Sequence, residues 1–145
     1  MRVVVQRVID ASVEIEGKIN GQIDKGYMLL VGFGLDDNIE IVKKMAYKVA
    51  NLRIFPDSND KLNLSIKDVD GKILSISQFT LYGDARKGNR PSFTSALKDG
   101  AKELYLEFNE ILRKDYNLVV EEGIFGADMN VKITNVGPTT ILLEI

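Results

Sequence analysis

The sequence predicts an α+β fold, with a mostly antiparallel sheet and two helices grouped against it. Three observations support this prediction: valines fill much of positions 2–8, two long segments place apolar residues at helical spacing, and strand-like runs flank those segments. The 145 residues fit a single domain, residues 1–145. A chain of this size buries roughly 70% of its unfolded surface, which is enough for a core without disulfides.

The first strands are expected near the N-terminus. Residues 2–8 are rich in valine, and from Ser12 to Glu16 apolar and acidic side chains alternate as on a half-buried strand. The run YMLLVGF at 27–33 is continuously apolar, which is typical of a central strand. Glycines and an Asn-Gly pair separate these segments.

Two helices are expected. The first would begin at Asp36 and Asp37, because Asp37 followed by Glu40 resembles a capping box. Its apolar face would comprise Ile39, Val42, Met45, Ala46 and Val49. The second would run from about Phe93 to Tyr116, with an apolar stripe of Leu97, Ala101, Leu104, Phe108, Ile111 and Leu112.

The remaining segments predict further strands and a long loop. The polar region 56–71 is typical of a loop with a short strand, and ILSISQFTLY at 73–82 predicts a long strand. Strands are also predicted near 118–122, 129–134 and 139–145.

The composition excludes several kinds of catalysis. There is no histidine and no cysteine, so the chain has no Ser-His-Asp triad, thiolate nucleophile, disulfide or zinc–thiolate site. An enzyme of this composition would take its base from a carboxylate, a lysine, a tyrosine, water or the substrate. No glycine-rich phosphate loop and no carboxylate cluster with metal spacing is present, so no cofactor and no metal are expected.

The charge and hydropathy patterns point to a cytoplasmic protein. The net charge of −2 argues against a general nucleic-acid coat but leaves room for a local basic patch. No run of about 18 apolar residues is present to span a membrane. The N-terminus lacks the apolar length and the cleavage site of a signal peptide.

Polar side chains interrupt the predicted strand at Ser77-Gln78-Phe79-Thr80-Leu81. On a regular strand Gln78 and Thr80 would share one face. That face is either the solvated side of an outer strand or the lining of a pocket whose amide and hydroxyl groups bind a polar ligand.

Two glycine-containing segments near the C-terminus have similar alternatives. Gly137-Pro138, within NVGPTT at 135–140, is either a turn between two strands or a rigid backbone surface with exposed carbonyl acceptors. The segment GIFGADM at 123–129 is either a turn with a buried phenylalanine or the wall of a pocket.

One segment is locally basic. Between Ala85 and Lys98 there are four basic side chains and no acidic ones: Arg86, Lys87, Arg90 and Lys98. This segment is either a solvated loop or a binding site for phosphates, to which arginine and lysine donate charge-assisted hydrogen bonds.

These motifs together resemble the D-aminoacyl-tRNA deacylase family over essentially the whole chain. The resemblance depends mainly on SQFTL at 77–81 and NVGPTT at 135–140. Supporting blocks follow in the same order: VQRV at 5–8, ASV at 11–13, RIF at 53–55, RPSF at 90–93 and GADM at 126–129. Related deacylases have a different motif in place of SQFTL, so the chain resembles the D-specific branch.

The resemblance implies an esterase that releases a D-amino acid, or glycine, from the 3′-terminal adenosine of tRNA. It implies a barrel-like sheet core with helices outside, and a homodimer. It also implies that Gly137-Pro138 is a cis peptide that reaches into the partner's pocket. There its carbonyls would hold the substrate's amino group, and its backbone would exclude L side chains.

The resemblance also assigns the site residues. The catalytic wall would consist of Ser77, Gln78, Phe79 and Thr80, with backbone N–H groups forming an oxyanion hole. Substrate binding is expected from Gly137, Pro138, Arg7, Met129 and Phe125, with Arg7 bracing the Gly-Pro loop and Met129 lining the adenosine pocket. The acceptor-stem phosphates would meet Arg86, Lys87 and Arg90.

Two mechanisms and two other functions stay open at this point. Thr80 invites a nucleophilic mechanism, but an activated hydroxyl needs a base and histidine is absent. The resemblance favours an alternative in which the terminal ribose 2′-OH assists an activated water. A non-catalytic module that binds RNA ends and a plain dimeric structural domain are the competing functions.

Overall fold

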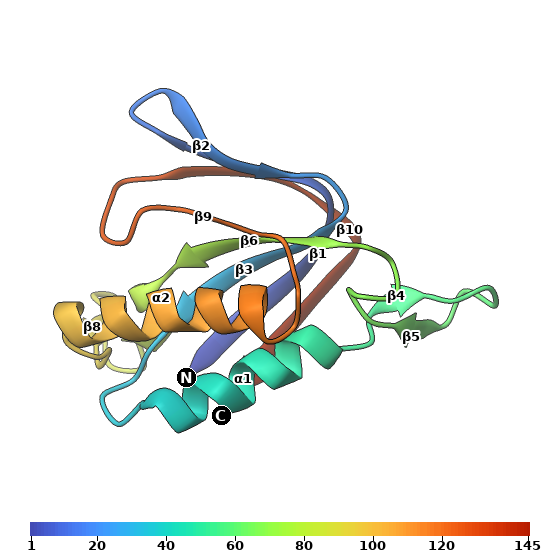
Figure 1. The fold of residues 1–145 in the computed structure, drawn as a ribbon. Helices are drawn as coiled ribbons and strands as arrows, with labels where there is room; N and C mark the ends of the chain where they lie inside the picture. Colours follow the sequence, from blue (N-terminus) through green and yellow to red (C-terminus); the bar gives the residue numbers. More distant parts are fainter.

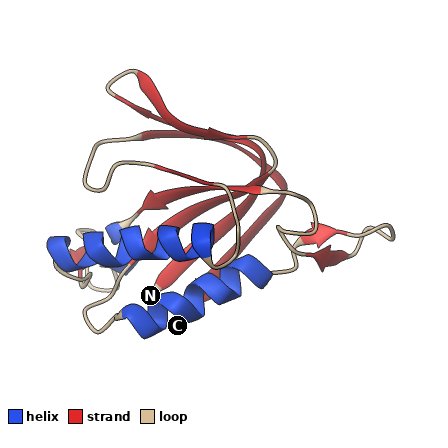
Figure 2. Ribbon diagram, in the orientation of Figure 1, coloured by secondary structure: helices blue, strands red, loops and turns tan.

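The computed structural model describes residues 1–145, the whole chain, and contains one curved six-stranded sheet with two helices on one face (Figures 1 and 2). The strand order is β10-β1-β3-β6-β9, with β2 beside β1. The strands of this sheet are β1 (Arg2–Ile15), β2 (Lys18–Ile23), β3 (Gly26–Gly32), β6 (Lys72–Ser77), β9 (Val120–Glu122) and β10 (Asn130–Glu144). The sheet is nearly closed and barrel-like, as the resemblance implied.

The sheet is mixed, so the prediction of a mostly antiparallel sheet is only partly right. β1 pairs antiparallel with β2, β3 and β10, whereas β6 pairs parallel with both β3 and β9. The cause is the position of the helices α1 (Ile39–Asn51) and α2 (Lys98–Lys114) in the chain. Each helix connects two neighbouring strands, and a helical crossover returns the chain in the same direction.

The core has two parts. The larger lies between the sheet and the helices, and it includes Val42, Met45, Ala46 and Val49 of α1, as predicted. The smaller lies inside the curve of the sheet, around Val8, Met28 and Leu74. On α2 the buried face includes Ala101, Phe108, Ile111 and Leu112 as predicted, and also Tyr105 and Asn109.

Both helices begin later than predicted. The N-cap of α1 is Asn38, whose Oδ1 accepts hydrogen bonds from the N–H groups of Glu40 and Ile41. Asp37 does not cap the helix, because its carboxylate binds the Met1 ammonium and the Gly34 N–H, each at 2.7 Å. Before α2, Ser92–Phe93 forms the short strand β8 with β7 (Gly83–Asp84).

The predicted strand over 73–82 ends early. β6 stops at Ser77, and residues Phe79–Tyr82 form the 3₁₀ turn η1. The Gln78 N–H still donates to the Val31 carbonyl at 2.7 Å, after which the chain turns and the Leu81 N–H donates to the Gln78 carbonyl. The polar region after α1 contains the small hairpin β4 (Phe55–Pro56) and β5 (Leu62–Leu64), which confirms a loop with a short strand.

Gly137-Pro138 lies inside a strand, so the prediction of separate strands at 129–134 and 139–145 is wrong, and the turn, one of the two alternatives for Gly-Pro, is not formed. β10 is continuous, but its register against β1 jumps from Thr140 opposite Gln6 to Asn135 opposite Val8. Residues 136–139 therefore bulge out opposite Arg7. The Gly137-Pro138 peptide is cis, as the resemblance implied.

No helix in the structure has both the length and the apolar character needed to cross a membrane.

Candidate functional site

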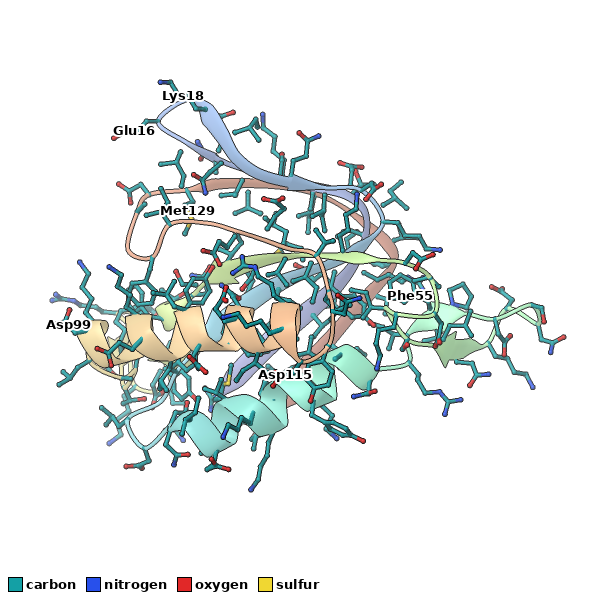
Figure 3. The ribbon with its side chains drawn as sticks, in the orientation of Figure 1. Glu16, Lys18, Phe55, Asp99, Asp115 and Met129 are labelled. Atoms are coloured by element: carbon teal, nitrogen blue, oxygen red, sulfur yellow. The ribbon has the colours of Figure 1, made fainter.

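The candidate site is a cavity of about 700 Å³ at one end of the sheet. It lies where β3 and β6 end, below the connection between β9 and β10 and beside the first turn of α2. Figure 3 marks two sides of this region, with Met129 on the β9–β10 connection and Asp99 at the start of α2. The volume is within the usual range for small-molecule sites, about 300–1,000 Å³.

The first wall of the cavity is the end of β6, with Ser77, Gln78 and Phe79 among its lining residues. Gly32 allows this wall to approach β3, since a Cβ at that position would lie 2.8 Å from the Gln78 carbonyl oxygen. Gln78 Nε2 donates a hydrogen bond to Thr80 Oγ1. The structure therefore brings Ser77, Gln78 and Phe79 to the cavity, with Thr80 held beside them.

Phe79 is held at the cavity edge by a second aromatic ring. Its ring centroid lies 5.1 Å from that of Phe93, and the rings are tilted by 59°. Phe79 is nevertheless 58% exposed. A large apolar ring that is fixed on one side and open on the other is suited to contact a ligand.

The second wall is the connection between β9 and β10. Phe125 and Met129 both line the cavity, together with residues 126–128. Phe125 packs on Tyr105 of α2, with ring centroids 5.9 Å apart. Gly123 leaves room for Met129, because a Cβ at Gly123 would collide with the Met129 sulfur.

The third side of the cavity was not predicted. Ser95, Ala96, Leu97 and Lys98 line it, because the chain runs along the end of β3 before α2 begins. The Ala96 N–H donates to the Phe33 carbonyl at 2.9 Å, and Ser95 forms a bridge with Gly34. The sequence pattern had placed Leu97 on the buried stripe of a helix, whereas it is the N-cap and is 82% exposed.

Gly137 and Pro138 do not line this cavity. Their bulge lies opposite Arg7, which pairs with Tyr27, whereas the cavity begins at Val31 and Ser77. Four residues along β3 separate these levels, a distance of roughly 13 Å. The structure of one chain therefore does not bring the two motifs together.

Hydrogen bonds from the side chains of Arg7 and Asn135 fix the position of the bulge. Arg7 donates from Nη1 to the Ile54 carbonyl at 2.8 Å and from Nη2 to the Val136 carbonyl at 3.3 Å. Asn135 Nδ2 bridges the bulge by donating to the carbonyls of Arg7 and Thr139. Gly137 and Pro138 themselves are exposed.

The basic loop is less basic than its sequence suggests. Arg86 Nη2 lies 2.6 Å from an Asp84 carboxylate oxygen, and this pairing lowers the pKa of Asp84 to about 2. The charge of Arg86 is therefore largely matched at neutral pH. Lys87 and Arg90 are exposed, and neither lines the cavity.

The site offers positioning groups rather than a preformed nucleophile. The group that contacts the Thr80 hydroxyl is the Gln78 amide, which donates a hydrogen bond and is not a base. No group of three or more carboxylates lies close enough together to hold a metal ion. The lining residues with ionisable side chains are Lys98 and Asp128.

The chain matches one protein family over almost its full length. The family model described as D-Tyr-tRNA(Tyr) deacylase matches residues 4–144. A D-aminoacyl-tRNA deacylase of Exiguobacterium sibiricum is 55% identical over 145 residues, covering 99% of each chain. A D-aminoacyl-tRNA deacylase of Fervidobacterium nodosum is 57% identical, covering 99% of this chain and 97% of its own.

Two solved structures share the fold. A c-Myc DNA unwinding element binding protein superposes with a TM-score of 0.95 at 40% identity, over 100% of this chain and 99% of its own. A probable eukaryotic D-amino acid tRNA deacylase superposes with a TM-score of 0.84 at 19% identity, over 99% of this chain and 98% of its own.

These matches define a class, the deacylases, which are ester hydrolases. The chain belongs to the D-Tyr-tRNA(Tyr) deacylase family, because the family model spans nearly the whole chain and curated relatives are more than half identical to it. This result confirms the family resemblance of the SQFTL and NVGPTT motifs.

Proposed function

We propose that this protein hydrolyses the ester bond of D-aminoacyl-tRNA, and of glycyl-tRNA, releasing the amino acid and free tRNA. The observation that most supports this function is the cavity between Ser77–Phe79 and Phe125–Met129, which brings part of the SQFTL motif together with the GADM block. The names of the relatives indicate the substrate. The cytoplasm, where tRNA is charged, is the proposed location.

The Gly137-Pro138 bulge acts in trans, in the cavity of a second subunit. Two observations support this proposal: the bulge is exposed, and it does not line the cavity of its own chain. The bulge also lies on β10, which forms the edge of the sheet and contains no buried residue. An unpaired edge of this length is a surface that proteins normally cover.

In the assembled site, the backbone of the bulge selects the substrate. Its carbonyl oxygens accept hydrogen bonds from the substrate's amino group, and an L side chain would collide with the cis peptide. A D side chain points away from the peptide, and glycine has no side chain to exclude. Arg7 positions the bulge through its hydrogen bond to the Val136 carbonyl.

The cleavage step uses the substrate's own hydroxyl. The ribose 2′-OH of the terminal adenosine assists a water that attacks the ester carbonyl, while Phe79 and Thr80 position the ester. Backbone N–H groups of η1 stabilise the oxyanion, a contribution typically worth about 10²–10³ in rate. Correct orientation of the reacting groups lowers the barrier by up to about 7–11 kcal/mol.

A deacylation assay on one tRNA charged with D-tyrosine, L-tyrosine or glycine tests the function. We expect release of D-tyrosine and glycine with many turnovers per enzyme, and no release of L-tyrosine above the uncatalysed rate. Stoichiometric binding of D-tyrosyl-tRNA without release would instead identify a module that only binds RNA ends.

A second assay separates the two mechanisms. A D-aminoacyl-tRNA that ends in 2′-deoxyadenosine, esterified at its 3′-OH, should react at least about 10²-fold more slowly if the 2′-OH takes part in the reaction. Full turnover of this substrate would exclude that role. Thr80→Ala should retain activity within about tenfold, whereas abolished turnover would support a hydroxyl nucleophile.

A further inference from the structure

We propose that Lys98 binds the phosphate that joins the terminal adenosine to the rest of the tRNA acceptor strand. The inference rests on the proposed function, because it takes the aminoacylated adenosine as the occupant of the cavity. Lys98 is the first residue of α2 and the only basic residue that lines the cavity. The loop residues Arg86, Lys87 and Arg90 do not line it.

The side chain of Lys98 lies along the second wall. A Cβ built on Gly126 would be 3.3 Å from Lys98 Cε and 3.6 Å from Nζ. The ammonium group is therefore next to the backbone of the segment that includes Phe125 and Met129, the two residues proposed to hold the nucleoside. A positive charge thus lies at the end of that wall, next to the nucleoside rather than on a distant loop.

The charge of Lys98 is not matched within the protein. Lys98 takes part in none of the ion pairs of the structure, each of which is formed by a different cationic group. Asp128 is the only acidic residue that lines the cavity, and it makes no ion pair with Lys98. Arg86, by contrast, already binds the Asp84 carboxylate. Lys98 therefore keeps its ammonium donors available for a ligand.

The path of the tRNA strand out of the cavity would bring the phosphate next to the terminal adenosine close to Lys98. The aminoacyl ester must lie inside the cavity near Phe79, and the chain must leave through the mouth, because the rest of the tRNA is outside. Leu97, next to Lys98, is 82% exposed and marks this mouth. A lysine ammonium is a compact charge with three donors, which suits the single charge of a phosphodiester.

Ligand binding without any reaction tests this role. Adenosine and adenosine 5′-methylphosphate, whose one charge matches a diester, are titrated by NMR into the wild-type protein, Lys98→Met, Lys98→Arg and a control, Lys44→Met, at an exposed position of α1. We expect the methylphosphate to bind wild-type protein about tenfold more tightly than adenosine, which is the usual scale of one charge-assisted contact. Lys98→Met should remove this preference, while Lys98→Arg and Lys44→Met should retain it.

Three results would overturn the role of Lys98. They are equal affinity of the wild-type protein for the two ligands, a preference that survives in Lys98→Met, and binding of neither ligand. The assay on D-tyrosyl-tRNA is independent of these titrations, so hydrolysis by the wild-type protein would still stand if the Lys98 inference failed. The second result includes the case in which Lys98→Met loses affinity for adenosine and for the methylphosphate equally, because the preference is then unchanged.

Discussion

Among the single residues of the proposed site, Gly137 has a backbone conformation that residues with a side chain rarely adopt. Its φ is +113°, and a Cβ would lie 2.7 Å from Thr139 Oγ1 and 3.2 Å from Arg7 Nη2. Glycine is suited to this region because it has no Cβ. Both the strain and the contacts predict that any substitution moves the bulge.

We predict that Gly137→Ala lowers kcat/KM for D-tyrosyl-tRNA by at least about tenfold, since the displaced carbonyls no longer meet the substrate. It should also lower the free energy of unfolding by about 1–3 kcal/mol because of backbone strain. Gly17→Ala is the matched control, because Gly17 has a φ of +77° and no neighbour within 4 Å of a Cβ.

The control should lose about 1–2 kcal/mol of stability and keep full activity. Deacylation rates and urea unfolding of the two variants provide the comparison. An active Gly137→Ala enzyme with unchanged preference for D-tyrosine would contradict the role of the bulge.

A motif can indicate which side chains lie together, but it does not reveal positions that depend on the path of the chain. Ser77, Gln78, Phe79, Phe125 and Met129 all line the cavity, and their roles in it stay predictions. Lys98 was grouped with the basic loop by its charge, while apolar spacing placed it within a helix that began at about Phe93. The Ala96 N–H donates to the Phe33 carbonyl, so the helix begins only at Lys98, and sequence spacing does not reveal such a tertiary contact.

At the level of elements, the start of α1 depends on one side chain. Asn38 Oδ1 accepts from the Glu40 N–H at 3.0 Å and from the Ile41 N–H at 3.3 Å. Asn38→Ala should therefore lower the free energy of unfolding by about 1 kcal/mol, the usual effect of losing an N-cap. Asp36→Ala, at an exposed position, should change it by less than about 0.5 kcal/mol.

Chemical denaturation of both variants measures the difference. Equal stability of Asn38→Ala and Asp36→Ala would contradict the cap. The sequence predicted the helix but assigned the cap to Asp37. A capping box describes local chemistry only, and the Met1 ammonium and the Gly34 N–H compete for that carboxylate.

The basic loop gives a second prediction at this scale. Asp84 neutralises Arg86, so Asp84→Asn should raise the affinity for tRNA and steepen its salt dependence by about 0.7–0.9 in the slope of log K against log salt. Filter binding of uncharged tRNA between roughly 50 and 200 mM salt measures that slope. An unchanged slope would show that Arg86 does not meet phosphate.

The pH dependence of this effect has a definite sign. The pKa of Asp84 in the folded protein is lowered from 3.8 to about 2. The ion pair with Arg86 is therefore fully formed at pH values above 3.8, and it is lost only as the pH falls through about 2. The difference in tRNA affinity between wild-type protein and Asp84→Asn should therefore stay constant from pH 6 to 8. A difference that disappears within this range would contradict the ion pair.

At the level of the whole molecule, the sequence predicted the number of main helices and the α+β class but not the pairing of the strands. Apolar patterns mark 27–33 and 73–77 as buried strands, yet they do not reveal which strands are neighbours or in which direction they pair. The parallel pairing of β6 follows from the two helical crossovers. The continuous β10 was also missed, since Gly-Pro normally indicates a turn.

The fold separates the two family motifs within one chain. SQFTL forms a cavity wall at one end of β3, and the Gly137-Pro138 bulge lies at the level of its other end. A site that needs both motifs therefore needs two chains. The exposed edge of β10, with Leu142 60% exposed, is the surface where we expect the second subunit to approach.

Complementation between two impaired variants tests whether the site is shared between two subunits. Phe79→Ala loses the cavity wall but keeps the bulge, whereas Gly137→Ala keeps the wall but loses the bulge. In a mixed dimer, one of the two sites combines the intact cavity wall of one subunit with the intact bulge of the other. About half of the dimers are mixed after subunit exchange in an equal mixture, so the mixture should recover about a quarter of wild-type activity on D-tyrosyl-tRNA. Activity no higher than that of the separate variants, in a mixture shown to contain mixed dimers, would contradict a site shared between subunits.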